Sequence, residues 1–230
     1  MKFSNEAIIL SARKFGERDL ICHIFTRQHG LYSGFVRAGQ SAKKIAIYQT
    51  GNLVEVNWKA RLDNQLGSIE AELVAPLYSE FMHNMPRLVA VLSACAILRK
   101  TIAEREPHEN LFELFLDFLR AENWQQEYVS FELGLLRDLG FGLDLGKCAV
   151  TGQTNDLVYI SPRTGRAVSQ LGAKGYEDKL IIMPNFADDH KTALCITEYF
   201  LNKYALNSSG SVGSLLWEAG SLLTAVPAAS

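Results

Sequence analysis

The sequence is poor in cysteine, and its cysteines are too scattered to form a metal-binding or redox motif. Only four are present, and no two of them stand in a CxxC arrangement. Disulfide frameworks and zinc sites usually show thiols at short, regular spacing, so a disulfide framework is not expected. Each thiol stands beside apolar residues, which predicts buried, reduced cysteines in a cytosolic protein. The four are Cys22, Cys95, Cys148 and Cys195.

Long hydrophobic runs are also missing. The longest, residues 88–98, has eleven residues with Ser93 inside it, whereas a helix that crosses a bilayer needs about 20 apolar residues. After Lys2 the first apolar run covers only residues 7–10, which is too short for the core of a secretion signal. The sequence therefore predicts a soluble cytoplasmic protein that has no membrane partner.

No motif of a known enzyme class stands out. Gly140 and Gly142 begin a pattern like a dinucleotide-binding loop, but Leu145 occupies the place of the third glycine. Glycines that end a helix are the better interpretation. Ser41 and Lys44 match a Ser-x-x-Lys pattern without any companion motif. The five histidines show no spacing typical of metal ligands or catalytic triads. We predict neither catalysis nor a cofactor.

Zinc often stabilises small turn-rich segments, and residues 148–183 form such a segment. Cys148 opens a hairpin of the kind that zinc commonly holds, but Thr151 stands where a second thiolate would be needed. No further Cys or His follows until His190. A structural zinc site has about four ligands, so the sequence predicts no metal site.

Charge is distributed unevenly along this chain of 230 residues, 48% of which are hydrophobic. Residues 1–62 carry ten basic and four acidic side chains, a balance of +6. Residues 79–146 carry six basic and eleven acidic ones, a balance of −5. A basic N-terminal third is typical of a unit that binds a polyanion. An unevenly charged but otherwise ordinary solvated surface is the alternative interpretation.

The N-terminal third alternates between apolar and polar residues with the period of β-strands. In residues 53–59, Val54, Val56 and Trp58 point to one side, so core packing is the favoured role of Trp58. Five such segments within residues 1–78 fit a small closed β-barrel of the OB-fold type. The expected strands are residues 7–14, 20–26, 31–37, 53–59 and 68–74.

Beyond Pro76 and Pro86 the hydrophobic period changes to that of helices. Residues 79–206 are predicted to form a helical domain, with a last helix at about residues 190–204. An insertion of one or two small hairpins is expected at about residues 147–184, where turn residues are frequent. For the tail, residues 207–230, the pattern predicts no definite structure. The expected fold class is therefore α+β.

Cations and aromatic rings at the strand ends and loops of the expected barrel are candidates for binding nucleic acid. OB-folds bind single strands there, with cations on phosphates and aromatic rings stacked on bases. Phe15 and Tyr32 lie near turns and are the best candidates for stacking. The predicted DNA-binding residues are Arg13, Lys14, Arg18, Arg27, Tyr32, Arg37, Lys43, Lys44, Lys59 and Arg61.

Several motifs resemble those of the bacterial recombination mediator family RecO. Examples are Phe15-Gly16-Glu17 near the start and Cys148-Ala149-Val150-Thr151-Gly152 in the C-terminal half. The resemblance covers about residues 4–205 and depends on the order and spacing of the motifs together. They are residues 7–10, 15–21, 26–30, 37–44, 131–140, 148–152 and 161–169.

The resemblance implies an N-terminal OB-fold, a helical domain and a small zinc-finger-like insertion. Some family members carry four zinc cysteines in that insertion, and this chain retains only Cys148. The insertion is therefore expected to fold without metal. The end of the chain also lacks the basic, proline-containing tail associated with relatives.

For function, the resemblance implies a protein that binds single- and double-stranded DNA and anneals complementary strands. With its partner RecR, such a protein helps load the RecA recombinase onto DNA covered by single-strand-binding protein, at the bacterial nucleoid. It also docks the acidic tail of the single-strand-binding protein on its helical domain. Arg120 and Arg137 are the candidates for that docking edge, and ordinary pairing with nearby glutamates is the alternative.

These observations together predict a non-enzymatic mediator of DNA repair. The alternative is an OB-fold module that binds RNA, since the charge of the barrel does not distinguish the two sugars. A protein-interaction module without a role in DNA repair is a further alternative, and it requires the basic residues to be scattered around the barrel.

Overall fold

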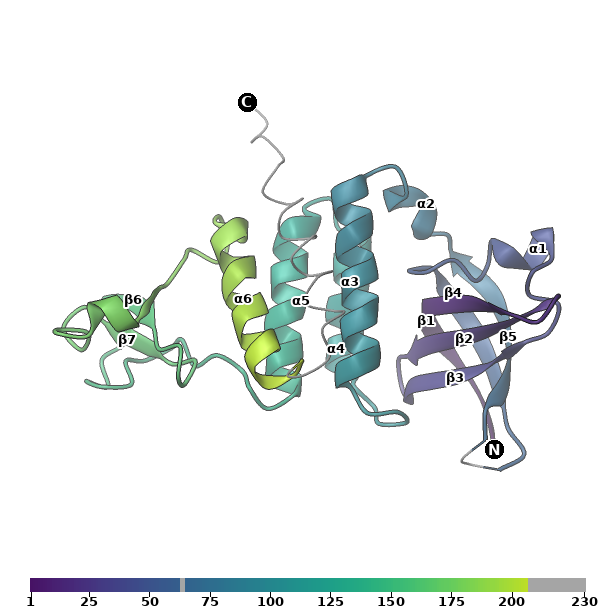
Figure 1. The fold of residues 1–230 in the computed structure, drawn as a ribbon, viewed down its shortest axis with the longest axis horizontal. Helices are drawn as coiled ribbons and strands as arrows, with labels where there is room; N and C mark the ends of the chain where they lie inside the picture. The colour runs from purple at the N-terminus through teal and green to yellow at the C-terminus, as the bar shows by residue number, and fades with distance from the viewer. Residues whose placement is uncertain (63–64, 207–230) are drawn as a thin grey trace.

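The computed structural model describes residues 1–62 and 65–206, and it confirms the α+β class. Figure 1 shows a β-barrel at one end of the molecule, a stack of helices in the middle and a small sheet at the other end. The predicted tail, residues 207–230, lies outside the described residues. No helix among the described residues is long and apolar enough to cross a membrane.

Five strands close the barrel in the order β1-β2-β3-β5-β4. Neighbouring strands are antiparallel except for a short parallel contact between β3 and β5. This closed five-stranded arrangement is the one expected of an OB-like domain. The strands are β1 (Lys2–Phe15), β2 (Asp19–Thr26), β3 (Gly30–Val36), β4 (Leu53–Lys59) and β5 (Gly67–Ala75).

Strand β1 is longer than its hydrophobic pattern indicates, because it serves two neighbours. Its first half pairs with β4, from Lys2 opposite Lys59 to Ile8 opposite Leu53. Its second half pairs with β2, and the register shifts between Ile9 and Ser11. Such an irregularity bends a strand, which lets one strand close a barrel of this size.

The barrel interior is apolar and tightly filled. Trp58 is only 1% exposed, as the period-two pattern predicts, and its indole nitrogen donates a hydrogen bond to the Ser33 carbonyl at 3.0 Å. A Cβ atom on Gly67 would lie 2.3 Å from the Trp58 ring, so only glycine fits beside the indole. Tyr32, Tyr48 and nine smaller side chains complete this core.

The helices pack into a second core that also covers part of the barrel. Within the stack of long helices, α3 is the one nearest the barrel in Figure 1, and it buries side chains on both of its sides. Ile8, Phe25 and Leu31 on the outside of the barrel belong to the same apolar cluster as the helices. The helices are α1 (Ala42–Ile45), α2 (Tyr78–Phe81), α3 (Met85–Thr101), α4 (Glu109–Arg120), α5 (Trp124–Asp138) and α6 (His190–Tyr204).

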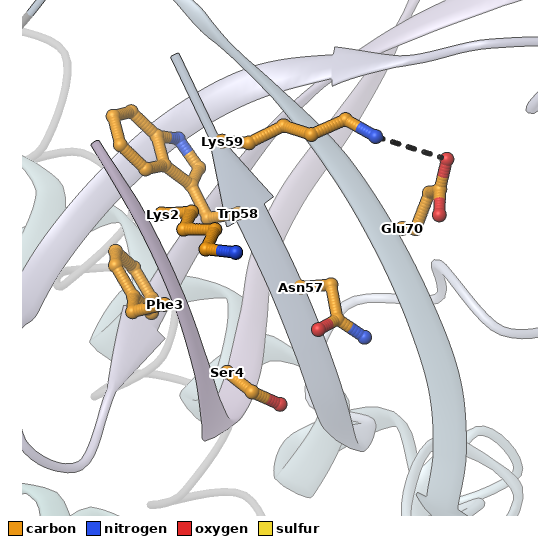
Figure 2. A pocket seen from close by; sticks show the side chains of 7 residues that line it. All are labelled: Lys2, Phe3, Ser4, Asn57, Trp58, Lys59 and Glu70. Carbon is orange, nitrogen blue, oxygen red and sulfur yellow. Dashed lines mark ion pairs between the residues drawn. The ribbon is translucent and has the colours of Figure 1, made fainter.

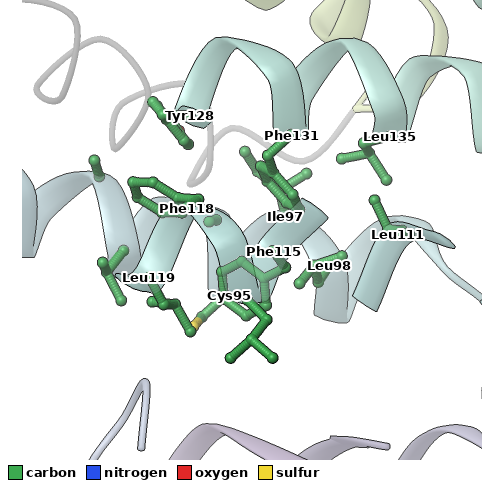
Figure 3. Packing of buried hydrophobic residues seen from close by; sticks show 14 of the residues in the cluster. Cys95, Ile97, Leu98, Leu111, Phe115, Phe118, Leu119, Tyr128, Phe131 and Leu135 are labelled. Atoms are coloured by element: carbon green, nitrogen blue, oxygen red, sulfur yellow. The ribbon is translucent and has the colours of Figure 1, made fainter. Parts of the chain in front are cut away.

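Aromatic rings dominate the contact between α4 and α5, as Figure 3 shows. Phe118 lies 4.9 Å from Tyr128, and Phe115 lies 5.2 Å from Phe131, measured between ring centroids. Rings at these distances add attraction beyond the apolar area that they bury. The helical region is therefore held by a continuous apolar core, in which aromatic rings fill the contact between α4 and α5.

The small sheet adds a third strand to the hairpin predicted there. Strand β6 (Leu157–Ile160) lies between β7 (Ala167–Ser169) and β8 (Ile181–Ile182), and a single 3-10 turn, η1 (Glu177–Lys179), precedes β8. The prediction of four buried thiols is wrong for Cys195, which lies exposed on α6. Its neighbours Leu194 and Ile196 are buried, and the helical period turns the residue between them outward.

Candidate nucleic-acid interface

The pairing register of β1, β2 and β3 places a mixed aromatic and basic surface on the outside of the barrel. Arg13 stands opposite Ile21, which stands opposite Phe35, and His23 stands opposite Ser11 and Ser33. Helix α3 covers the neighbouring part of these strands, around Phe25 and Leu31. The uncovered remainder, called the open face below, consists of Ser11, Arg13, Phe15, Ile21, His23, Ser33 and Phe35.

Two aromatic rings form a platform on the open face. Phe15 is 49% exposed, and its ring centroid lies 5.2 Å from that of Phe35. An exposed large apolar side chain is informative when it sits among cations, because single-stranded nucleic acids bind to such combinations. Phe15 is the stacking candidate that the sequence indicates, and the structure provides Phe35 as its neighbour.

Basic side chains surround this platform. The Lys44 ammonium donates to the Arg37 carbonyl at 2.9 Å, which holds the short helix α1 beside the end of β3. Phe35, Arg37, Lys44 and Lys59 line a small hollow of about 140 Å³. On the other side of the platform, Arg13, Lys14 and Arg18 lie exposed in and after the end of β1. The remaining predicted cations, Lys43 and Arg61, are also exposed.

The loops that carry these cations are tied together. The Gln40 side chain donates hydrogen bonds to the carbonyls of Gly16 and Asp19, at 3.1 and 2.9 Å. The Asp19 carboxylate in turn accepts from the Ala38 backbone N–H at 2.8 Å. These hydrogen bonds hold the turn between β1 and β2, which carries Arg18, beside the loop after β3, which begins at Arg37.

On the side of the barrel formed by β1, β4 and β5, basic side chains are followed along the strands by acidic ones. Figure 2 shows a hollow of about 430 Å³ lined by Lys2, Phe3, Ser4, Asn57, Trp58, Lys59 and Glu70. Lys59 already meets an acid there, the Glu70 carboxylate at 3.9 Å. Four residues further along, Glu6, Glu55 and Glu72 stand opposite one another on three adjacent strands. Arg27 pairs with Glu6, whereas no ion pair among the described residues involves Glu55 or Glu72. These two carboxylates disfavour phosphate on this side of the barrel.

Tyr32 does not belong to the open face, and the prediction that it stacks on a base is wrong. The residue is 3% exposed and lies in the barrel core, with its ring centroid 4.8 Å from that of Trp58. The Arg105 guanidinium, from the loop after α3, lies 5.6 Å from the Tyr32 ring. Tyr32 pairs with Ile24 of β2, whose side chain lies in the barrel core, so strand alternation turns residue 32 inward despite its place near a turn.

Arg27 has a different role from the other predicted cations. Its guanidinium contacts the Glu6 carboxylate at 2.6 Å, also pairs with Glu113 on α4, and lies 4.8 Å from the centroid of the Phe112 ring. Two carboxylates already neutralise this charge, so it adds little to a surface for phosphates. Arg27 connects the barrel to the helical region instead.

Arg120 and Arg137 do not form one docking edge. Arg120 ends α4 and Arg137 lies in the last turn of α5, and the two helices run in opposite directions with a short connection between them. The two side chains therefore stand at opposite ends of a helix pair that is about 18 Å long. Arg137 borders a hollow of about 600 Å³, which Leu111, Leu114, Gly134 and the carboxylates of Glu113 and Asp138 also line.

The described part of the chain contains no group of three or more His, Cys, Asp or Glu side chains that could hold a metal ion. The residues around Cys148 do not fit zinc, because hydroxyl and backbone donors surround its sulfur. The Cys148 sulfur accepts from the backbone N–H groups of Thr151 and Ser169 at 3.3 and 3.2 Å, and from the Ser169 hydroxyl at 3.3 Å. Burial raises the pKa of the Cys148 thiol, but these hydrogen bonds outweigh burial and lower it to about 6.

The closed barrel, its continuous core with the helices and the small distal sheet define an α+β protein with an OB-like N-terminal domain. Residues 1–77 match the family model "Recombination protein O N terminal", and residues 82–196 match "Recombination protein O C terminal". The chain belongs to the RecO family.

Curated relatives agree with this assignment over most of the chain. A DNA repair protein RecO of Rhodospirillum centenum is 40% identical over 217 residues, which cover 89% of this chain and 87% of the relative. The protein of the same name from Bartonella bacilliformis is 36% identical over 226 residues, 91% of each chain. That of Rickettsia africae is 34% identical over 224 residues, 92% of this chain and 94% of the relative.

Proposed function

We propose that this protein is a non-enzymatic mediator of DNA repair that binds single- and double-stranded DNA and anneals complementary strands. Membership of the RecO family supports a role in DNA repair and recombination. The observation that carries the finer proposal is the open face, where the exposed Phe15–Phe35 pair lies among cations. Such a surface offers stacking to bases and neutralises phosphates, which are the two needs of a single strand.

The proposed mechanism is electrostatic and geometric. Cations beside the open face neutralise phosphates of a first strand, and this lowers the repulsion that a second, complementary strand meets. Stacking on Phe15 keeps bases unpaired and spread until a partner strand arrives. No covalent bond is made or broken by the chain.

The proposed function includes three protein partners, namely RecR, RecA and the single-strand-binding protein. With RecR, the protein helps to load RecA onto DNA that is covered by single-strand-binding protein, at the nucleoid in the bacterial cytoplasm. The hollow beside Arg137 is the proposed docking place for the acidic tail of the single-strand-binding protein, since Arg137 lies there beside the apolar side chains of Leu111 and Leu114. The two carboxylates that also line the hollow, Glu113 and Asp138, already contact Arg27 and His108. Arg120, at the other end of the helix pair, is left out of this site.

The first test is fluorescence anisotropy of a labelled single-stranded oligonucleotide at several salt concentrations. We expect log affinity to fall with log salt at about −0.7 for each phosphate contacted, or about −3 to −6 in total. Lys43→Glu combined with Lys44→Glu should weaken binding to all sequences alike and flatten this slope. Annealing of a complementary strand should be lost in parallel.

Three results would argue against the proposal. Absence of binding even at low salt would remove nucleic acid from the function. Unchanged affinity of the Lys43/Lys44 double variant would place that loop outside the interface. A preference for RNA over DNA of about tenfold or more would favour an RNA-binding module, because only the 2′-hydroxyl separates the two ligands at such a site.

A further inference from the structure

A small hollow opens at the seam where β3 and β5 close the barrel. The register pairs Gly34 with Gly67 and Phe35 with Ser68, and β3 ends directly afterwards, at Val36. The hollow has a volume of about 140 Å³, that of about five water molecules in the liquid, so a phosphate group fits in it. Its lining comes from the end of β3, helix α1, β4 and β5, and includes Phe35, Arg37, Lys44, Lys59, Ser68 and Glu70.

Positive charge exceeds negative charge around this space, which is called the cationic hollow below. Three cations, Arg37, Lys44 and Lys59, and one carboxylate, Glu70, line it, which gives a balance of +2. The Glu70 carboxylate lies 3.9 Å from the Lys59 ammonium (Figure 2), and no ion pair among the described residues involves Arg37 or Lys44. Like charges around a small space repel one another, and an anion with two negative charges offsets this repulsion.

A hydrogen bond fixes Lys44 beside Arg37 before any ligand binds. The Lys44 ammonium donates to the Arg37 carbonyl at 2.9 Å, which leaves two of its three N–H donors for a ligand. The Arg37 guanidinium is exposed, and its planar set of N–H donors suits two phosphate oxygens at once. A phosphate in the cationic hollow therefore meets donors that the barrel and α1 already hold close together.

We propose that the cationic hollow binds the phosphate monoester at the end of a DNA strand. A phosphate monoester carries about 1.5 to 2 negative charges at neutral pH, which matches the charge of the lining, whereas each phosphodiester inside a strand carries a single charge. This inference rests on the proposed function and deepens it, because it adds a preference for strand ends to a surface that binds DNA.

The position of the cationic hollow fits the last nucleotide of a strand on the open face. Phe35 lines the hollow, and its ring centroid lies 5.2 Å from that of Phe15. Because one sugar joins a base to its own phosphate, the base can stack on this pair while the phosphate occupies the hollow. Beyond the hollow, Glu55 and Glu72 stand opposite each other on β4 and β5 and disfavour phosphate. A strand that crosses the open face thus reaches its last favourable phosphate position at the hollow.

The test compares forms of one labelled oligothymidine that bind to the full chain. The oligonucleotide has about 15 nucleotides, the upper range for one OB-fold site, and its fluorophore sits on an internal base so that both ends are free. The forms carry a 5′-phosphate, a 3′-phosphate or no terminal phosphate. In anisotropy at low salt, wild type should bind one phosphorylated form about tenfold more tightly than the form without phosphate, as expected for hydrogen bonds to a charged group. The preferred form identifies the end of the strand.

Two neighbouring lysines of α1 provide matched variants. Lys44→Gln removes a cation of the hollow and should reduce the preference to about twofold or less. Lys43→Gln removes an exposed cation of the same helix outside the hollow, so it should weaken all forms alike and keep the preference. Because Lys44 also holds α1 beside β3, Lys59→Gln repeats the test with an exposed residue of β4. Equal thermal midpoints of the variants exclude misfolding.

The outcomes separate this inference from the proposed function. If wild type binds all forms equally, the strand-end site is refuted and the function stands, whereas failure to bind any form at low salt refutes both. Equal loss of the preference in Lys43→Gln and Lys44→Gln would refute the hollow in favour of general charge.

Inorganic phosphate without DNA gives an independent arm, with the ionic strength matched by sodium chloride. Suppose that phosphate raises the thermal midpoint of wild type but not of Lys44→Gln, while wild type shows no preference among the oligonucleotides. This result would assign the hollow to a free anion and overturn the strand-end assignment.

Discussion

The barrel and the helical region handle charge in opposite ways. In the described part of the barrel, the buried polar side chains are uncharged, namely Asn5, Thr26 and Asn52, and the charged ones lie on its outer surface. The helical region buries a carboxyl group, Glu132, at 1% exposure and a guanidinium, Arg87, at 9%. Charge on the barrel is thus available to a ligand, whereas charge among the helices acts on the stability of the fold.

Glu132 illustrates the second case. It lies on α5 and accepts a hydrogen bond from the Thr197 hydroxyl on α6, in the apolar contact between the two helices. Burial raises the pKa of Glu132 to about 7, against the opposing effect of this hydrogen bond. A neutral carboxyl group is therefore part of the packed core, and ionising it disturbs the contact between α5 and α6.

The largest expected effect is on stability. The folded pKa of Glu132, about 7, lies above the ordinary value of 4.5, so the folded state holds a proton that the unfolded state releases. The stabilisation is complete below about pH 4.5 and disappears as the pH rises through about 7, for a total of up to about 3 kcal/mol. Glu132→Gln should remove this loss and make the protein more stable than wild type at about pH 8.5. Urea unfolding at both ends of this range measures the difference.

A matched control separates burial from simple removal of a negative charge. Glu122→Gln changes an exposed acid just before α5 and should follow the wild-type pH dependence. Affinity for DNA should stay the same in both variants, because neither residue lies on the open face. The account would be contradicted if wild type and Glu132→Gln showed the same change in the free energy of unfolding between about pH 5 and 8.

Charge reversal on the barrel should have the opposite effect to the Glu132 variant, because it should change DNA affinity and leave stability nearly unchanged. Arg13→Glu with Arg37→Glu removes cations on both sides of the Phe15–Phe35 pair. If each contact contributes about 1.4 kcal/mol, affinity for single-stranded DNA should fall by about 100-fold. The free energy of unfolding should change little, because both side chains are exposed. Anisotropy and urea unfolding of the same preparation test the two statements together.

The acidic row provides the control for this pair. Glu55→Gln with Glu72→Gln removes two negative charges from the β4–β5 side of the barrel. If the strand binds to the open face, this variant should gain at most a few-fold in affinity through long-range attraction, which salt screens. A loss of affinity comparable to that of the double reversal would show that the strand crosses the acidic side.

A smaller effect is expected from the aromatic platform. Phe15→Ala should weaken the binding of single-stranded DNA by about 1 to 2 kcal/mol, as expected for one lost base stack. The slope of log affinity against log salt should not change. Double-stranded DNA should be affected much less, because its bases are already stacked on one another. Leu171→Ala, which changes an exposed apolar residue in the turn after β7, is the matched control. Equal losses for both forms of DNA would place Phe15 outside a stacking contact.

Much of the barrel is predictable from the sequence because its strands have one buried side and one exposed side. The alternation in residues 53–59 is enough by itself to assign Trp58 to the core, where the side chain indeed lies. The first half of β1 escapes this pattern, because the inward residue Asn5 is polar and makes its hydrogen bonds to Gln28 instead. The prediction for Tyr32 fails for a related reason, because the alternation of side chains along β3 decides which way the ring points.

The site is less predictable, because it depends on register and on contacts between distant segments. The sequence indicates Phe15, but its pairing with Phe35 follows only from the alignment of β1, β2 and β3. Arg27 looks like any other cation near a turn until its contacts with Glu6 and Glu113 are seen.

Arg27 gives the smallest expected effect on DNA and the sharpest contrast within the barrel. Its two carboxylate partners and the Phe112 ring occupy the guanidinium, so Arg27→Gln should change DNA affinity by less than about twofold and lower the free energy of unfolding by about 1 kcal/mol. Arg37→Gln removes an exposed cation that has no ion-pair partner among the described residues. This variant should lower DNA affinity by more than about twofold and leave the free energy of unfolding nearly unchanged. If Arg27→Gln lowered DNA affinity as much as Arg37→Gln, the total charge of the barrel rather than the position of the open face would govern binding. Two arginines of the same barrel therefore decide whether position or total charge makes this surface a nucleic-acid interface.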